Sequence, residues 1–284
     1  MIVDFHAHVF PPEVCRRRDD YLRRDPTFRE LYSNPKAALA TADDLLASMD
    51  EAGIDKSVVV NFAWQDAALC RQTNDYILES AAASNGRLLP FCIVQPASGD
   101  EARTEVERCA RAGALGLGEL RPDDQGYDLA ASPEADLLVW AAKTHGLALL
   151  FHVSEPVGHS YPGKSGLSLK TLYRFIEKAP GVTVVAAHWG GGLPFYGLMP
   201  RVKKALATTY FDTAATPLLY DPSVYRHAID IVGGERILFA SDFPFLSQKR
   251  CLRETRKAGL SEQELRLILG GNALRLLGLP DDRR

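Results

Sequence analysis

Two histidines one residue apart, His6 and His8, end the first apolar run of the chain (IVDFHAH). Alternate residues of a strand point to one face, so both imidazoles can converge on one point. Three later apolar runs also end in polar residues: His152 in LLFHVSE, His188 in VVAAHWGGG and Asp242 in LFASDFP. Imidazoles and a carboxylate suit Zn²⁺, with Mn²⁺ or Fe²⁺ as alternatives. These residues predict a divalent-metal site.

Each of these residues also has an ordinary structural explanation. A lone histidine at a strand end is usually a core or surface residue, and Asp242 before Phe-Pro can form an Asx turn. However, four of the seven histidines follow apolar runs, and an acid follows another. That coincidence favours the metal site over separate structural roles.

The elements that must position these residues form a repeating pattern. Eight apolar runs alternate with amphipathic segments, and buried parallel strands have this composition. The predicted strands begin at Ile2, Lys56, Leu88, Ala114, Leu147, Val182, Thr209 and Arg236. The predicted helices cover 43–52, 73–84, 101–112, 133–144, 168–178, 223–232 and 261–269. This order predicts an α/β fold, a (β/α)₈ TIM barrel whose strands carry an active site at their carboxyl ends.

Length and composition agree with one enzyme domain. The 284 residues form one predicted barrel domain, 1–284, with an insertion at 10–41 that we expect to lie over the barrel mouth. A net charge of -3 without a clustered basic face argues against nucleic-acid binding. No apolar run approaches the roughly 20 residues of a membrane span. We expect a cytoplasmic protein with a small-molecule substrate, and a homo-oligomer is compatible with the sequence.

The sequence resembles the amidohydrolase superfamily, in the amidohydrolase-related (amidohydrolase 2) branch of metal-dependent hydrolases and decarboxylases. The matching motifs are DFHAH at the start, His152, AHWGGG around His188, SDFP around Asp242 and GNALRL near the end. The resemblance implies that His6, His8, His152 and Asp242 hold the metal and that Asp242 is also the base. It implies for His188 either substrate contact or a second metal.

Strand 4 carries Glu119 within GELR and has no lysine, which excludes a carboxylated lysine there. Glu119 is either a further metal ligand, bridging two ions as in some branches of the superfamily, or a structural acid paired with Arg121. We expect one ion rather than two.

The substrate contacts are predicted on the loop after strand 5 and beside the mouth. Loops at this end of a barrel set specificity. The candidates are Arg121, Glu155, His159, Lys164 and Trp64. The alternative is that the loop residues are surface groups and that Trp64 packs against the rim.

Three functions remain open. The leading prediction is hydrolysis of a small ester, lactone or amide by a metal-activated water, with Asp242 and His188 as catalytic residues. The alternative is non-oxidative decarboxylation of an aromatic or unsaturated carboxylate, and the second alternative is a non-catalytic ligand-binding barrel. Glu119 as a ligand of a second metal would favour hydrolysis, whereas Arg121 or Lys164 aimed at the metal would favour decarboxylation.

Overall fold

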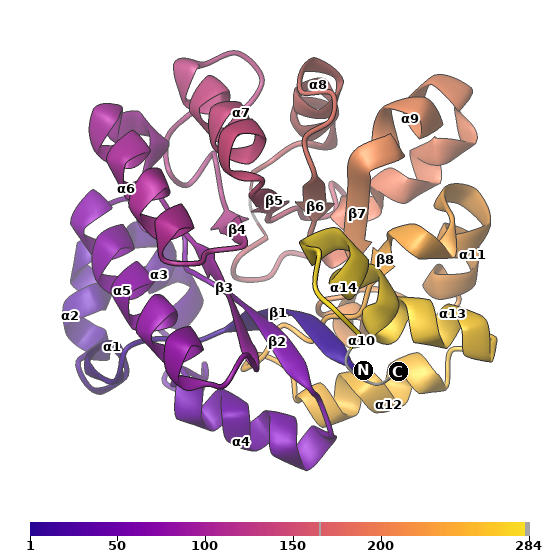
Figure 1. The fold of residues 1–284 in the computed structure, drawn as a ribbon, viewed down its shortest axis with the longest axis horizontal. Coiled ribbons are helices and arrows are strands. Elements are labelled where there is room, and N and C mark those ends of the chain that lie inside the picture. The colour runs from indigo at the N-terminus through magenta and orange to yellow at the C-terminus, as the bar shows by residue number, and fades with distance from the viewer. Residues whose placement is uncertain (165, 282–284) are drawn as a thin grey trace.

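The computed structural model describes residues 1–164 and 166–281, and eight parallel strands form the centre of the fold (Figure 1). Neighbouring strands follow the chain order from β1 to β8. The strands are β1 (Val3–His8), β2 (Lys56–Val60), β3 (Leu88–Cys92), β4 (Gly116–Leu120), β5 (Ala148–Phe151), β6 (Val184–Ala186), β7 (Thr209–Asp212) and β8 (Ile237–Leu238). The predicted (β/α)₈ barrel is confirmed, and every strand lies within the apolar run that predicted it.

The barrel closes where β1 meets the residues that follow β8. The Phe5 amide donates to the Phe239 carbonyl over 2.8 Å, and the Asp242 amide donates to the His6 carbonyl over 2.9 Å. His8 and Phe243 continue this pairing with a bond of 2.7 Å. Backbone pairing at this junction therefore places Asp242 beside His6 and His8, although more than 230 residues separate them in sequence.

Helices surround the strands as an outer ring (Figure 1). The main ones are α4 (Ala42–Ala52), α5 (Ala67–Ala83), α6 (Asp100–Arg111), α7 (Pro133–His145), α8 (Leu169–Lys178), α9 (Pro200–Ala205), α11 (Val224–Val232), α12 (Gln248–Arg256), α13 (Glu262–Arg266) and α14 (Asn272–Leu277). All seven predicted helices are present. Helix α5 starts six residues before its predicted position because the Asp66 side chain caps it, accepting a hydrogen bond from the Ala68 amide. The sequence patterns did not predict α9 and α12.

The segment after β1 forms three short helices, α1 (Pro12–Arg16), α2 (Arg18–Arg24) and α3 (Pro26–Tyr32). Phe28 of α3 stacks on Trp64 with ring centroids 5.1 Å apart, and Asp25 accepts a hydrogen bond from the Gln65 amide. Both contacts tie the segment to the residues that follow β2, which places α3 at the mouth of the barrel.

Within the described residues, no helix combines the length and the apolar character that crossing a membrane requires.

Candidate metal centre

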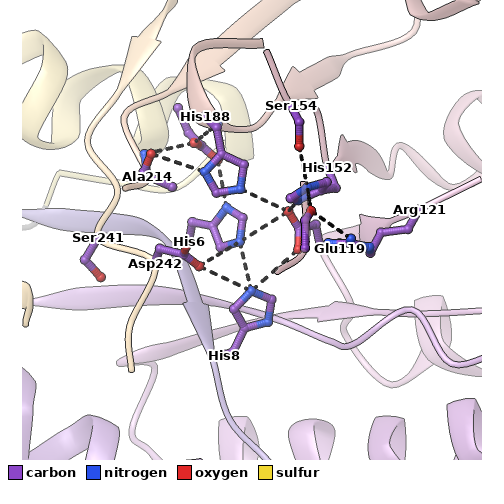
Figure 2. A network of polar contacts seen from close by, with 12 residues as sticks. His6, His8, Glu119, Arg121, His152, Ser154, His188, Ala214, Ser241 and Asp242 are labelled. Atoms are coloured by element: carbon purple, nitrogen blue, oxygen red, sulfur yellow. Dashed lines mark hydrogen bonds and ion pairs between the residues drawn. The ribbon is translucent and has the colours of Figure 1, made fainter. Parts of the chain in front are cut away.

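Six titratable side chains meet at the carboxyl ends of five strands (Figure 2). They are His6 and His8 of β1, Glu119 of β4, His152 directly after β5, His188 two residues after β6, and Asp242 beyond β8. The side chain of His6 is fully buried, and that of Asp242 is the most exposed of the six at 15%. The structure thus brings together every residue predicted to bind the metal.

His6, His8 and Asp242 form one side of the cluster. The Nε2 atoms of His6 and His8 face each other at 3.0 Å. The Oδ1 atom of Asp242 lies 3.6 Å from Nε2 of His8 and 3.8 Å from Nε2 of His6. Two imidazole nitrogens at hydrogen-bond distance need a proton or a metal ion between them, because two lone pairs repel. This donor set fits a divalent cation.

Glu119 lies between this side and the pair His152 and His188. Its Oε1 atom is 2.8 Å from Nδ1 of His152 and 3.5 Å from Nε2 of His188, and its Oε2 atom is 3.6 Å from Nε2 of His8. Two groups of three side chains can each hold an ion with ligand atoms within 4.8 Å of one another, namely His6, His8 and Glu119, and Glu119, His152 and His188. Glu119 belongs to both groups.

The electrostatics of the cluster favour a bound cation. Burial opposes a charge on His6, but Glu119 and Asp212 raise the pKa of His6 to about 10. Burial and the neighbouring His6 lower the pKa of His8 to about 4, which leaves the His8 lone pair available. Burial alone would raise the pKa of Glu119, yet His152 and His6 hold it well below its usual range. A metal ion would take the place of the proton that these acids keep on His6.

Asp212, at the end of β7, was not among the predicted site residues. It is fully buried, and its Oδ2 atom lies 2.9 Å from Nδ1 of His6. Its Oδ1 atom accepts a hydrogen bond from the His188 amide over 2.9 Å. The rule that singled out the other strand-end residues also applies to the run TYFDTAA and could have found Asp212.

Asp4 is a second buried acid for which the sequence predicted no role. Its side chain holds the residues that follow β8. It accepts hydrogen bonds from the Ser241 amide over 2.9 Å and from Nε2 of Gln248 over 2.7 Å. Because Ser241 precedes Asp242, Asp4 helps to fix the position of Asp242.

The loop after β5 closes over the cluster. The Gly163 carbonyl lies 2.9 Å from Nε2 of His152 and accepts a hydrogen bond from Nη2 of Arg121 over 3.1 Å. The Gly163 amide donates to Glu30 of α3 over 2.9 Å. Arg121 is buried and also pairs with Asp124. The predicted loop and the segment after β1 therefore meet above the barrel mouth.

Most polar groups of this loop bond within the loop itself. Nζ of Lys164 donates to the carbonyls of Val157 and His159 over 2.7 and 2.9 Å and lies 3.6 Å from Oε1 of Glu155. The Tyr161 hydroxyl donates to Glu155 over 3.0 Å. His159 is exposed. Within the described part of the chain, none of these predicted loop residues hydrogen-bonds a metal ligand through its side chain, whereas buried Arg121 shares the Gly163 carbonyl with His152.

Trp64 is a buried residue after β2. It has no exposed surface, and its indole Nε1 donates to Oγ1 of Thr73 over 3.1 Å. Packing in the core therefore describes Trp64 better than the predicted substrate contact.

Fold and cluster together define a (β/α)₈-barrel enzyme with a candidate metal centre at the carboxyl ends of its strands. The family model described as amidohydrolase matches residues 3–279. The chain belongs to this family, and it is an enzyme of the branch that the sequence motifs indicated.

Several solved structures share the fold over the whole chain. The 5-carboxyvanillate decarboxylase of Sphingomonas paucimobilis is 20% identical, with 98% of this chain and 99% of that chain covered and a TM-score of 0.79. The 2,6-dihydroxybenzoate decarboxylase of Rhizobium is 18% identical, with 98% of both chains covered and a TM-score of 0.75. A dihydroxybenzoic acid decarboxylase of Polaromonas sp. JS666, with bound manganese and the inhibitor 2-nitroresorcinol, is 18% identical, with 98% and 96% covered and a TM-score of 0.75.

Proposed function

We propose that this protein is a metal-dependent, non-oxidative decarboxylase of a small aromatic or unsaturated carboxylate. The observation that carries the proposal is a buried guanidinium, Arg121, beside the metal-ligand cluster, where it shares the Gly163 carbonyl with His152. A guanidinium carries five N–H donors, so Arg121 can keep its pair with Asp124 and also bind an anionic substrate. The decarboxylases that share the fold support the same reaction class.

We assign one divalent ion to His6, His8, His152 and Asp242, with Glu119 as a further candidate ligand. When bound, such an ion would orient and polarise the carboxyl-bearing substrate. Imidazole and carboxylate donors suit Zn²⁺ and also Mn²⁺, the ion found in the Polaromonas enzyme, and Fe²⁺ remains compatible with them.

The chain's own residues then supply binding and proton transfer. Arg121 attracts the carboxylate, and the Gly163 carbonyl above His152 covers the site and limits the access of water. Burial opposes a charge on His188, but Glu119 and Asp242 raise its pKa, so that its Nε2–H can hydrogen-bond a substrate oxygen. When the bond to the carboxyl carbon breaks, CO₂ leaves and the electron pair stays on the substrate carbon. Asp242, the most exposed acid of the cluster, is placed to take a proton from water and pass it to that carbon.

A second candidate is hydrolysis of a small ester, lactone or amide. The specific observation in its favour is that Glu119 belongs to both candidate ligand groups, which suits a carboxylate shared by two ions. In this reaction Asp242 would accept the proton of an attacking water, and His188 would stabilise the oxyanion. Two ions per chain are the feature that separates this candidate from the decarboxylase.

The test is a panel of substrates assayed with metal-free protein and with Mn²⁺- or Zn²⁺-loaded protein. The panel holds hydroxylated aromatic carboxylates, unsaturated carboxylates, lactones and aryl esters. We expect CO₂ release from at least one carboxylate in the metal-loaded protein only, and its loss in Arg121→Gln. Turnover of lactones or esters with no CO₂ release from any carboxylate would contradict the decarboxylase proposal and support hydrolysis.

A further inference from the structure

Asp212 uses its two carboxylate oxygens on two different residues of the metal-ligand cluster, His6 and His188. Its Oδ2 atom lies 2.9 Å from Nδ1 of His6. Its Oδ1 atom accepts hydrogen bonds from the amides of His188 and Ala214 over 2.9 and 3.0 Å. The side chain has no exposed surface, so water does not compete for either oxygen.

The first contact determines which ring nitrogen of His6 carries hydrogen. A carboxylate oxygen only accepts hydrogen bonds, so Nδ1 of His6 must be the donor. Once a metal ion replaces the Nε2 proton, the Nε2 lone pair of His6 faces His8, Glu119 and Asp242. Metal-binding histidines usually hold their other ring nitrogen in this way. His8 differs, because its buried Nδ1 atom has no hydrogen-bond partner among the described residues.

The second contact holds the turn that presents His188. His188 and Trp189 have φ angles of 55° and 57°, in the left-handed region that non-glycine residues rarely adopt. The hydrogen bond from the His188 amide to Asp212 stabilises this turn. One carboxylate therefore orients a predicted metal ligand on β1 and fixes the backbone of a predicted catalytic residue after β6.

We propose that Asp212 is a positioning residue that keeps His6 in the Nδ1–H tautomer and thereby sets the affinity for the divalent ion. The inference rests on the metal site assigned above but not on the reaction catalysed there. Strand β7 supplies no predicted metal ligand, but its residue Asp212 orients His6, a predicted ligand on β1.

The decisive variant is Asp212→Asn. The amide oxygen can still accept from the His188 and Ala214 amides, whereas the amide nitrogen now faces Nδ1 of His6 as a donor. Nδ1 must then accept, the hydrogen moves to Nε2, and His6 loses its lone pair toward the cluster. Loss of such a partner typically costs about 10–100-fold in metal affinity.

Asp25→Asn is the matched control. Asp25 is also fully buried, and its two oxygens accept hydrogen bonds from the Phe28 and Gln65 amides without touching an imidazole. The two variants make the same chemical change in a buried carboxylate, so a purely structural effect would appear in both. Folding of each is checked by circular dichroism and thermal unfolding.

Zn²⁺ affinity is measured by chelator competition on the wild type and both variants. We expect the dissociation constant to rise about 10–100-fold in Asp212→Asn and to change less than about twofold in Asp25→Asn. An unchanged affinity in folded Asp212→Asn, or equal losses in the two variants, would overturn the proposal.

A second measurement keeps the proposal testable if Asp212→Asn does not fold. Histidine ring nitrogens of the ¹⁵N-labelled wild type are observed by NMR, and the His6 signals are identified by their absence from His6→Asn. We expect a protonated Nδ1 on His6 with and without Zn²⁺, and an unprotonated Nδ1 in either state would overturn the proposal. Because neither readout uses turnover, failure of the decarboxylase assay and failure of this inference are separate results.

Discussion

The strand-end cluster and the loop that covers it are built in opposite ways. In the cluster, buried side chains from distant strands contact one another, as Glu119 of β4 does with His8 of β1 and His152 after β5. In the loop 155–164, the polar groups mainly contact one another, as Lys164 does with Glu155 and with the Val157 carbonyl. Among the described residues of this loop, Gly163 makes the hydrogen bonds toward the cluster, through His152 and Arg121.

This difference suits the cluster to binding the metal and the loop to admitting the substrate. Strands held in register by backbone hydrogen bonds can hold ligand atoms within the roughly 0.5 Å that a functional site requires. A loop that is bonded mainly to itself can move as a unit and admit a substrate. We therefore expect changes in the cluster to abolish metal binding or turnover, and changes in the loop to alter substrate use while the metal stays bound.

The largest effect is expected from the double variant His6→Ala/His8→Ala. It removes two adjoining ligand nitrogens, so bound metal should fall below about a tenth of the wild-type content, measured by elemental analysis after dialysis. The far-ultraviolet circular dichroism should remain that of a folded barrel, because the strands pack through their apolar residues. Full metal content in this variant would show that the ion binds elsewhere.

A smaller but still large effect is expected from Asp242→Asn. The amide oxygen can still face the metal, but the side chain can no longer exchange a proton, so kcat should fall about 10²–10⁴-fold. Metal content should fall much less, and measuring both on one preparation separates the two roles. Near-normal turnover with the true substrate would remove Asp242 from the proton-transfer step.

The smallest effects are expected in the loop, where Lys164→Ala and His159→Ala form a matched pair. Lys164 bonds two loop carbonyls, so its loss should lower kcat/KM about tenfold, or about 1.4 kcal/mol, with metal content unchanged. His159 is exposed and contributes its backbone carbonyl to this contact, which alanine retains, so its variant should lose less. Equal and unchanged kinetics in both variants would show that the loop takes no part in substrate use.

Much of this arrangement was predictable because strands and strand ends leave local signals. An apolar run marks a buried parallel strand, and a polar residue at its end lies at the barrel mouth, which led directly to His6, His8 and Asp242. Glu119 was found by the same rule, but its central place depends on distances between strands that no local pattern contains. Asp212 was missed because a single acid without a motif resembles any capping residue.

The loop was less predictable for a different physical reason. Sequence placed Lys164 and His159 near the mouth, yet whether a side chain faces the substrate or its own loop depends on the loop conformation. The link from Gly163 to Arg121 and Glu30 uses backbone groups, which any residue carries. Similarly, the burial of Trp64 results from packing against Phe28 in a segment that had no clear helical pattern.

The central claim is that the strand-end cluster holds one divalent ion on which decarboxylation depends. The most direct test is to titrate metal-free wild-type protein with Mn²⁺ or Zn²⁺ and to follow bound metal and CO₂ release together, using a carboxylate found in the substrate panel. The account predicts that both quantities rise in parallel and saturate at one ion per chain. Saturation at two ions, or CO₂ release that does not depend on added metal, would contradict it.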